Sequence, residues 1–413
     1  MGVRLDHQDS YLTEFYATLA ETRTDGRGTW LRLDRSAFYP TSGGQPHDTG
    51  ALTVADVRLR VRDVQVEDGA VWHLVAASAG SDGAEPSAIA AVIGSEVHGL
   101  IDWERRYRHM QRHTGQHLLS QALVRVNPEY GTRSVSMRGA ECTIDFGGEA
   151  DEAALAAVEA EVNSAARRAL AVMTFQVDDS RLGEYRLRRP AKVSGTVRLV
   201  AIGDYDLVAC GGSHVRNSAE VLPVKIVGLE RVKGGTNRLT FRAGEEALDD
   251  YACKHAITST LSVALSAPVE ELPARVEQLR AELAEQGLAL DKARRAQAAA
   301  LAERLSAQAE AGQVVAYLGA NDAALFPELV DLMQRATGLV TFLAAEEGGA
   351  GRVRFAFLAG PGVDVDVRPL LNTALAQLGG RGGGRPDRAQ GAAEADEEQA
   401  LAALSAAAAQ LNS

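Results

Sequence analysis

The sequence contains few cysteines, only Cys142, Cys210 and Cys253 among its 413 residues. Three cysteines cannot form the disulfide framework of a small secreted protein, and they favour a reducing compartment. The chain also lacks an apolar run of about 18 residues, which a transmembrane helix needs. Its first residues lack the apolar core of a secretory signal. We therefore expect a soluble, cytoplasmic protein without a membrane partner.

Positive charge is also scarce, because the formal net charge is −12. This excess of acid is a weak argument against a nucleic-acid partner, since phosphate binding needs local Lys and Arg. Three basic clusters nevertheless occur, at residues 105–108, 186–192 and 381–388. Each alone is most simply a solvated surface, but three in one chain keep nucleic acid open as a partner.

The length and the patterning predict an α+β multidomain protein with four segments. Residues 1–92 show short alternating runs separated by turns, which predict a small N-terminal β-barrel. Residues 93–243 mix helices and strands and predict an α+β domain. Residues 244–311 predict a helical hairpin or coiled-coil linker, and residues 312–413 a small C-terminal α/β domain.

The helical segment has a break near Ala267-Pro268 and a short heptad-like pattern before its later positions become polar. The pattern consists of Leu272, Val276, Leu279 and Leu283. It is too short for a long parallel zipper. We expect an antiparallel hairpin, with a contact through which two copies could form a homodimer.

Two short clusters predict a metal site, namely His113-Thr-Gly-Gln-His117 and Cys210-Gly-Gly-Ser-His214. The two histidines are four residues apart, so on a helix they share one face. Glycines permit the tight turn that brings the second pair together. One thiolate and three imidazoles suit Zn²⁺. Whether such a zinc is structural or catalytic stays open at this point.

His109 has the same spacing to His113 as His113 has to His117. All three cannot face one ion equally well, because each four-residue step rotates about 40° around a helix. We favour the later pair because two leucines follow it directly, and we expect His109 to face solvent or substrate. Cys142 and Cys253 are expected to be buried thiols without a role.

The motifs resemble those of the alanyl-tRNA editing proteins, free-standing relatives of the editing domain of alanyl-tRNA synthetase, and specifically their long form. The resemblance includes Phe38–Pro46 with Asp48 and Gly50, Arg112–Ala122, Cys210–Val215, and the glycine-rich segment Gly379–Gly391. The two ligand motifs are shared with the editing domain of threonyl-tRNA synthetase. The first and last motifs narrow the resemblance to the alanine branch.

This resemblance implies one Zn²⁺ per chain, bound by His113, His117, Cys210 and His214. It implies hydrolysis of the ester that joins serine or glycine to the tRNA for alanine. No aminoacylation domain is recognised, so we expect no aminoacylation activity. Taken without the resemblance, the glycine-rich segment would be a flexible linker; with it, Arg381, Arg385 and Arg388 are expected to bind the tRNA elbow.

Substrate-recognition residues are predicted around the zinc helix. Gln116 could orient water or the ribose. Thr132, Ser134 and Ser136 alternate along a strand, so we expect one shared face and a contact to the serine hydroxyl. Gly43-Gly44 is associated with serine specificity in the family that the motifs resemble.

Two other functions stay open from the sequence. One is a non-catalytic tRNA-binding protein with a structural zinc. The other is an editor of Ser-tRNA(Thr), which the glycine-rich C-terminal signature disfavours.

Overall fold

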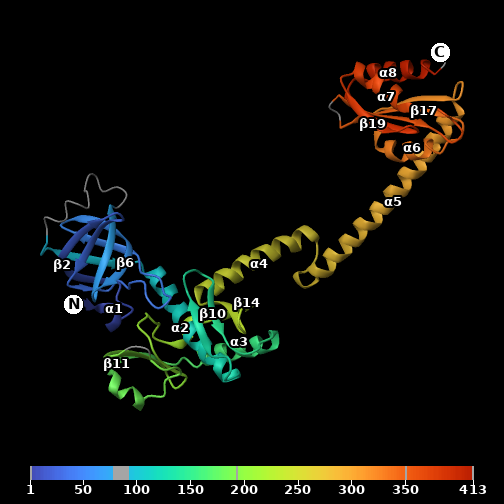
Figure 1. Cartoon of the computed structure of the whole chain (residues 1–413). Coiled ribbons are helices and arrows are strands. Elements are labelled where there is room, and N and C mark those ends of the chain that lie inside the picture. Colours follow the sequence, from blue (N-terminus) through green and yellow to red (C-terminus); the bar gives the residue numbers. More distant parts are fainter. Residues whose placement is uncertain (1, 78–92, 192–193, 349–350, 412–413) are drawn as a thin grey trace. The chain divides into compact units, whose positions relative to one another are not determined.

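The computed structural model describes residues 2–77, 93–191, 194–348 and 351–411, and it divides into two compact units, Met1–Thr260 and Leu261–Ser413 (Figure 1). Lys192 of the second basic cluster lies outside the described residues. The finer division into four segments stays a prediction. Among the described residues, no helix combines the length and apolar character that a bilayer crossing requires.

The N-terminal strands close into a six-stranded barrel, as predicted (blue in Figure 1). Its strands, in spatial order, are β2 (Glu14–Asp25), β3 (Gly28–Leu33), β7 (Ala70–Ala77), β6 (Val57–Glu67), β5 (Gly50–Val54) and β8 (Glu96–Ile101). Alternate residues fill the interior, because successive side chains of a strand point to opposite faces. β8 pairs with both β2 and β5, so the barrel extends past the boundary placed at residue 92.

Three short elements precede or flank the barrel: β1 (Val3–Arg4), α1 (Leu5–Gln8) and β4 (Arg35–Ser36). Helix α2 (Trp103–Val126) begins one residue after Asp102, whose carboxylate accepts a hydrogen bond from the Arg105 N–H. This contact is an N-cap, which satisfies a backbone donor that the first helical turn leaves unpaired. The end of the barrel therefore determines where the predicted metal-ligand helix begins.

An antiparallel four-stranded sheet packs with α2 and α3 (Glu152–Arg167) around one apolar core. Its strands, in order, are β14 (Val224–Val232), β15 (Thr236–Ala243), β10 (Cys142–Phe146) and β9 (Thr132–Ser136). A separate three-stranded sheet contains β11 (Val172–Asp178), β12 (Thr196–Ile202) and β13 (Asp206–Ala209). Gly115 of α2 lies so close to β15 that an added Cβ would lie 2.9 Å from the Ala243 Cβ.

A buried ion pair joins the barrel to α2. The Arg106 Nε donates to Asp48 Oδ2 at 2.9 Å, and neither side chain is exposed to solvent. Arg106 also donates to the backbone carbonyls of Ser10 and Ala37. The Tyr39 N–H donates to the same Asp48 oxygen, so both ends of the loop between residues 37 and 48 are fixed to one helix residue.

The second half of the chain begins with two helices, α4 (Glu245–Leu265) and α5 (Leu272–Ala307), with the break that the sequence predicted between them. Whether they form a hairpin or a homodimer contact stays a prediction. Of the two cysteines expected to be buried, Cys142 is, but Cys253 on α4 is exposed. The expectation for Cys253 was wrong because that face of α4 does not pack against the core of the first unit.

The C-terminal residues form a five-stranded sheet with helices on both faces. In order, its strands are β16 (Gln313–Leu318), β17 (Val340–Glu347), β18 (Arg352–Ala359), β20 (Arg388–Glu394) and β19 (Arg381–Arg385). Only β16 and β17 are parallel among these described strands. Helix α6 (Phe326–Met333) and the end of α5 belong to one apolar cluster, and α7 (Val367–Gln377) and α8 (Glu397–Ala409) belong to the other.

The glycine-rich segment is not the flexible linker that its composition alone would indicate. It forms the hairpin of β19 and β20, with β19 as an edge strand. Glycine is needed there for packing, because an added Cβ at Gly382 or Gly391 would lie 2.7 or 2.4 Å from the Leu375 Cδ1 of α7. The segment's glycines therefore have a structural function in the sheet.

Replacing Arg106 tests the buried ion pair. We expect Arg106→Met to lower the free energy of unfolding of the first unit by about 3–5 kcal/mol, because it leaves Asp48 buried without a counter-charge. All three tryptophans, Trp30, Trp72 and Trp103, lie in this unit, so urea unfolding followed by tryptophan fluorescence reports on it alone. The control Arg32→Met breaks a part-exposed pair with Glu21 and should cost about 1 kcal/mol or less. Equal losses in the two variants would contradict the assignment.

Candidate metal centre

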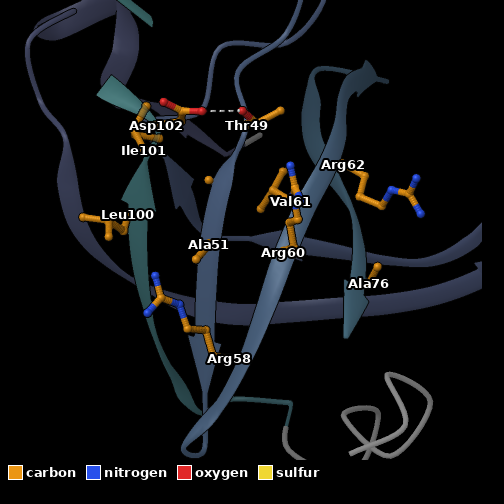
Figure 2. Close-up of a pocket in the computed structure, with 11 residues that line it drawn as sticks. Thr49, Ala51, Arg58, Arg60, Val61, Arg62, Ala76, Leu100, Ile101 and Asp102 are labelled. Carbon is orange, nitrogen blue, oxygen red and sulfur yellow. Dashed lines mark hydrogen bonds between the residues drawn. The ribbon is translucent and has the colours of Figure 1, made fainter. Parts of the chain in front are cut away.

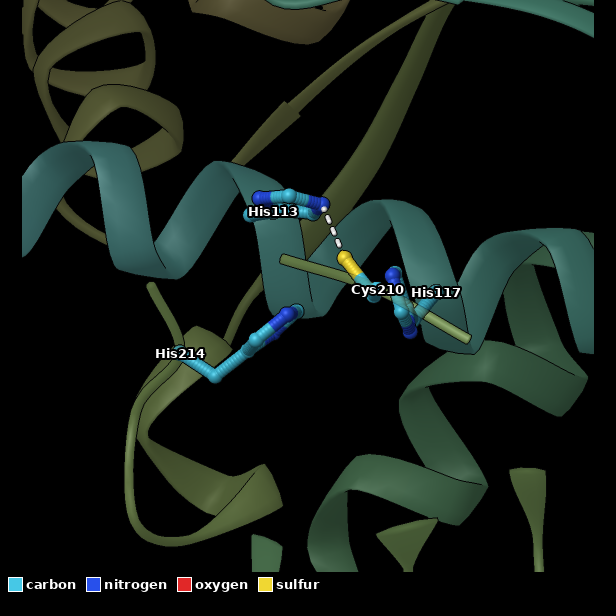
Figure 3. A group of neighbouring side chains, drawn as sticks. All are labelled: His113, His117, Cys210 and His214. Carbon is cyan, nitrogen blue, oxygen red and sulfur yellow. Dashed lines mark hydrogen bonds between the residues drawn. The ribbon is translucent and has the colours of Figure 1, made fainter. Parts of the chain in front are cut away.

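Four side chains converge at the centre of the first unit, although they come from two segments far apart in the sequence. One ligand atom from each of His113, His117, Cys210 and His214 can be chosen so that all lie within 4.8 Å of one another (Figure 3). Cys210 Sγ is 3.2 Å from His113 Nε2. The three imidazoles are buried and the thiol is partly buried. These side chains could hold one metal ion.

Helix α2 provides the two histidines, as predicted. His113 and His117 lie one turn apart on the same face, and their ring centroids are 5.1 Å apart. His109 does not join them, but the expectation that it faces solvent was wrong. It is buried, and burial together with Arg105 and Arg112 lowers its pKa to about 3. Every residue of α2 from His109 to Ser120 is buried, so the helix has no exposed face at this point.

The loop after β13 provides the other two ligands. Arg198 on the neighbouring strand β12 donates from Nη1 to the carbonyls of Cys210 and Gly212, both at 2.9 Å, and so holds the loop in shape. Gly212 passes directly beside the His113 ring, because an added Cβ would lie 2.0 Å from Cε1. Only glycine permits this approach.

Each imidazole is oriented by a partner on its outer nitrogen. His113 Nδ1 donates to the side-chain Oε1 of Gln45 at 2.7 Å, which leaves Nε2 facing Cys210. His214 Nδ1 lies 3.1 Å from the Thr114 hydroxyl, and its Nε2 is buried without a hydrogen-bond partner among the described residues. His117 Nδ1 lies 3.5 Å from the Asp206 carboxylate, within ion-pair distance but without a hydrogen bond among the described residues. Outer partners of this kind are typical of metal-binding histidines.

The pKa values of Cys210 and His214 suit a metal ion, whereas the pKa of His117 is raised, because the effect of burial is outweighed by Cys210 and Asp206. Burial alone would raise the pKa of Cys210, but the adjacent His113 and His117 outweigh it and hold the pKa well below its ordinary value. Burial lowers the pKa of His214 to about 3, with His113 adding to the effect. A thiolate and a neutral imidazole are the forms that bind metal. The unpaired His214 nitrogen and the anionic sulfur therefore fit a bound cation.

A cavity of about 520 Å³ opens beside Cys210. It is lined by residues of β12, of β13 and of the segment before β12, among them Arg189, Thr196, Arg198 and Gly211. The cavity therefore provides space next to Cys210, along the loop that follows β13.

The three predicted strand hydroxyls do not share one face. In the pairing of β9 with β10, Thr132 is opposite Phe146 and Ser134 is opposite Asp145, so Arg133 is the extra residue of a β-bulge. Ser134 donates to Asp145 on the exposed face. Ser136 lies with Ser134, while Thr132 is on the core side. The prediction from simple strand alternation failed because the bulge shifts the register of β9 against β10 by one residue.

Thr132 is connected to Gln116 through Ser120. Thr132 Oγ1 donates to Ser120 Oγ at 2.9 Å, and Gln116 Nε2 donates to the same oxygen at 2.7 Å. Gln116 and Ser120 are one turn apart on α2, on the face that also contains His113 and His117. The two predicted residues are therefore joined beside the metal ligands.

Gly43 and Gly44 form a turn with positive φ angles of 57° and 87°, next to the end of β9. The Gly44 carbonyl accepts a hydrogen bond from the Met137 N–H. A Cβ added at Gly44 would lie 3.3 Å from the Val135 carbonyl oxygen. The turn places Gln45 at the metal ligands, where its Nε2 also donates to Ser213. The structure thus gives these glycines a positioning role, and a contact to substrate stays a prediction.

The predicted tRNA-contacting arginines lie on the β19–β20 hairpin of the second unit. Arg381 and Arg385 are exposed. Arg388 forms an ion pair with Asp331 at 2.7 Å, and Arg385 lies 3.6 Å from Asp387. Of the three, Arg381 therefore has no acidic partner among the described residues.

Sequence reasoning missed the residues that orient the ligands: Gln45, Thr114, Arg198 and Asp206. Two signals were available. Gln45 lies within the quoted motif Phe38–Pro46, and Thr114 is inside the first ligand cluster. Asp206 and Arg198 flank Cys210 on paired strands, which only the sheet register reveals.

Comparison with known proteins gives three family matches. The family described as "tRNA synthetases class II (A)" matches residues 12–105, and the "Threonyl and Alanyl tRNA synthetase second additional domain" matches residues 197–240. The "DHHA1 domain" matches residues 310–413. The second match contains Cys210 and His214, whereas His113 and His117 lie outside all three.

Individual relatives extend over nearly the whole chain. The alanyl-tRNA editing protein AlaX-L of Pyrococcus horikoshii is 29% identical over 423 residues, which cover 97% of this chain and 96% of its own. The chain resembles the alanyl-tRNA editing proteins related to alanyl-tRNA synthetase over nearly its whole length. The alanine–tRNA ligase of Pyrococcus abyssi is 30% identical over 94% of this chain but only 41% of its own. The chain thus spans about two fifths of the length of that relative.

Solved structures also match, and one of them is a single synthetase domain. It is the C-Ala domain of Aquifex aeolicus alanyl-tRNA synthetase, 23% identical, with a TM-score of 0.20 over 23% of this chain and 88% of that one.

Replacing Gly212 tests the geometry of the centre. We expect Gly212→Ala to weaken Zn²⁺ binding roughly ten- to hundred-fold, because the new methyl group displaces the His113 ring, and disturbing the groups that orient a ligand has effects of this size. Gly211→Ala is the matched control, since an added Cβ there meets nothing within 4 Å. Competition with a chromophoric chelator measures both affinities. Equal affinities would contradict the arrangement of the four ligands.

Proposed function

We propose that the protein is a zinc-dependent hydrolase that deacylates tRNA(Ala) mischarged with serine or glycine. The observation that supports this most strongly is the convergence of His113, His117, Cys210 and His214 in a chain that resembles the editing proteins. The cavity beside Cys210 provides room for an aminoacyl end. An aminoacyl ester is already activated, so positioning and modest charge stabilisation are sufficient for its hydrolysis.

The four ligands would hold one Zn²⁺, which supplies Lewis acidity for attack on an ester carbonyl. The chain's own residues prepare the site. Gln45, Thr114 and Asp206 fix the imidazole orientations, and Arg198 holds the loop that contains Cys210. Burial excludes water from three of the four ligands.

Selection against alanyl-tRNA(Ala) requires recognition of a hydroxyl group. A pocket that merely has room for serine would also admit alanine. The linked side chains of Gln116, Ser120 and Thr132 offer donors and acceptors beside the metal ligands. A serine hydroxyl can exchange hydrogen bonds with such a group, whereas alanine would leave it unpaired. We propose Thr132 and Gln116, rather than Ser134, as the selecting residues.

The C-terminal unit is proposed to bind the tRNA elbow through Arg381 and Arg385 of the β19–β20 hairpin. Both guanidinium groups are exposed on an edge strand, and glycine neighbours leave the backbone N–H groups accessible to phosphate. Arg388 contributes less, because Asp331 already neutralises it.

A deacylation assay tests the proposed function. We expect the full chain loaded with Zn²⁺ to hydrolyse Ser-tRNA(Ala) faster than Ala-tRNA(Ala), by on the order of a hundred-fold or more, because the site hydrogen-bonds the hydroxyl. His117→Ala should lose both bound zinc and deacylation. Binding without turnover would instead indicate a structural zinc in a tRNA-binding protein. Preference for Ser-tRNA(Thr) would indicate the threonine branch, and either result would refute the proposal.

A matched pair of substitutions on β9 tests the assignment of selectivity. We expect Thr132→Val to lower kcat/KM for Ser-tRNA(Ala) roughly three- to ten-fold, which corresponds to one lost hydrogen bond. Ser134→Ala is the control, because Ser134 contacts Asp145 on the exposed face, and its effect should stay within about two-fold. A larger effect for Ser134→Ala than for Thr132→Val would reverse the assignment.

A further inference from the structure

The outer surface of the barrel contains an unpaired group of arginines. Arg58, Arg60 and Arg62 of β6, here called the arginine row, are all exposed, and they have no hydrogen-bonded or ion-paired acid among the described residues. Arginines nearby differ, since Arg32 of β3 is paired with Glu21 and Arg35 of the flanking strand β4 with Asp34. Three uncompensated positive charges in a chain of net charge −12 form a local anion-binding surface.

The arginine row lines a groove of about 950 Å³ (Figure 2). Its other walls come from β5, β8 and the residues that follow β8, with Ala51 and Leu100 on the neighbouring strands. Alternate residues of a strand are about 6.8 Å apart, so Arg58 and Arg60 lie in a line along β6. Arg62 is the extra residue of a bulge against β7, which redirects its side chain.

The acidic side chain that lines the end of the groove, Asp102, already accepts two hydrogen bonds. Asp102 accepts a hydrogen bond from the Thr49 hydroxyl at 3.1 Å and another from the Arg105 N–H. Its carboxylate is therefore an N-cap of α2, and among the described residues no ion pair joins it to the arginine row.

This end of the groove is close to the start of the helix that contains the metal ligands. Thr49 and Asp102 line it, and α2 begins at Trp103. From Trp103 to His113 is ten residues (113 minus 103), or about 15 Å along the helix axis. A linear anion that follows the arginine row is thus directed towards the metal centre.

We propose that this groove binds the phosphate backbone of the RNA strand that leads to the aminoacylated 3′ end. The inference rests on the proposed function and adds a second RNA contact, on the barrel rather than on the C-terminal unit. A polyanion with regularly spaced charges matches a line of arginines better than a single small anion does. The groove positions the strand, and base identity is not read there, because phosphate contacts contain no sequence information.

Salt-dependent binding of an uncharged tRNA(Ala) transcript to the full chain tests the groove without requiring turnover. Arg60→Gln with Arg62→Gln removes two contacts, and Arg32→Gln with Arg35→Gln removes two paired arginines, one from the barrel strand β3 and one from the flanking strand β4. We expect the first variant to reduce the slope of log Kobs against log salt by about 1.4, at 0.7 for each single-strand phosphate contact. Affinity at low salt should fall roughly ten-fold or more. The control variant should retain both values.

The outcomes separate the two proposals. Equal slopes for the two variants, or a wild-type chain that does not bind the transcript, would overturn the groove. A wild-type chain that binds with the predicted slopes but hydrolyses no aminoacyl ester would refute the proposed function and leave the groove standing. Tryptophan fluorescence of each variant confirms that the barrel is folded, because Trp30 and Trp72 are in its strands.

Discussion

The buried pair of Arg106 and Asp48 is the interaction on which the metal centre depends. Arg106 is on α2, two turns before His113, and Asp48 is on the barrel loop that contains Gln45. A charge in an apolar interior is tolerated only with a close partner and further hydrogen bonds. Here the backbone carbonyls of Ser10 and Ala37 accept from Arg106, while Asp48 Oδ1 has no hydrogen-bond partner among the described residues. The pair fixes the loop to the helix, and within this loop Gln45 contacts His113.

The centre is therefore an assembly of three segments: the barrel loop, α2 and the loop after β13. The barrel loop contributes Gln45, whereas the four candidate ligands come from α2 and from the loop after β13. Gly212 passes beside His113 because Arg198 holds two carbonyls of its loop. The site depends on the close approach of Gly212, on the hydrogen bonds of Arg198 and on the buried charges of Arg106 and Asp48. Each of these contacts requires its particular residue type.

Much of the fold could be predicted from the sequence, and the reasons for the failures are physical. Periodicity predicted the barrel and α2, because these patterns are local, and the ligand spacing predicted the four side chains that the structure brings together. The bulge at Arg133 was not predictable, since it depends on pairing with β10. His109 was expected to face solvent or substrate because nothing in the sequence around it indicates that this part of α2 is buried on all sides. The partners Gln45 and Asp206 were missed for the same reason, because both reach the site through tertiary contacts.

The ligand pairs are separated by 93 residues of chain (210 minus 117), and those residues form most of the core around α2. An unfolded chain cannot bring such distant donors together, so cation binding and folding of the first unit are thermodynamically linked. Occupancy by the ion would raise the melting temperature of the entire first unit. Conversely, a substitution that loosens its packing far from the ligands would be observed as poorer retention of the ion, even though no donor atom had changed.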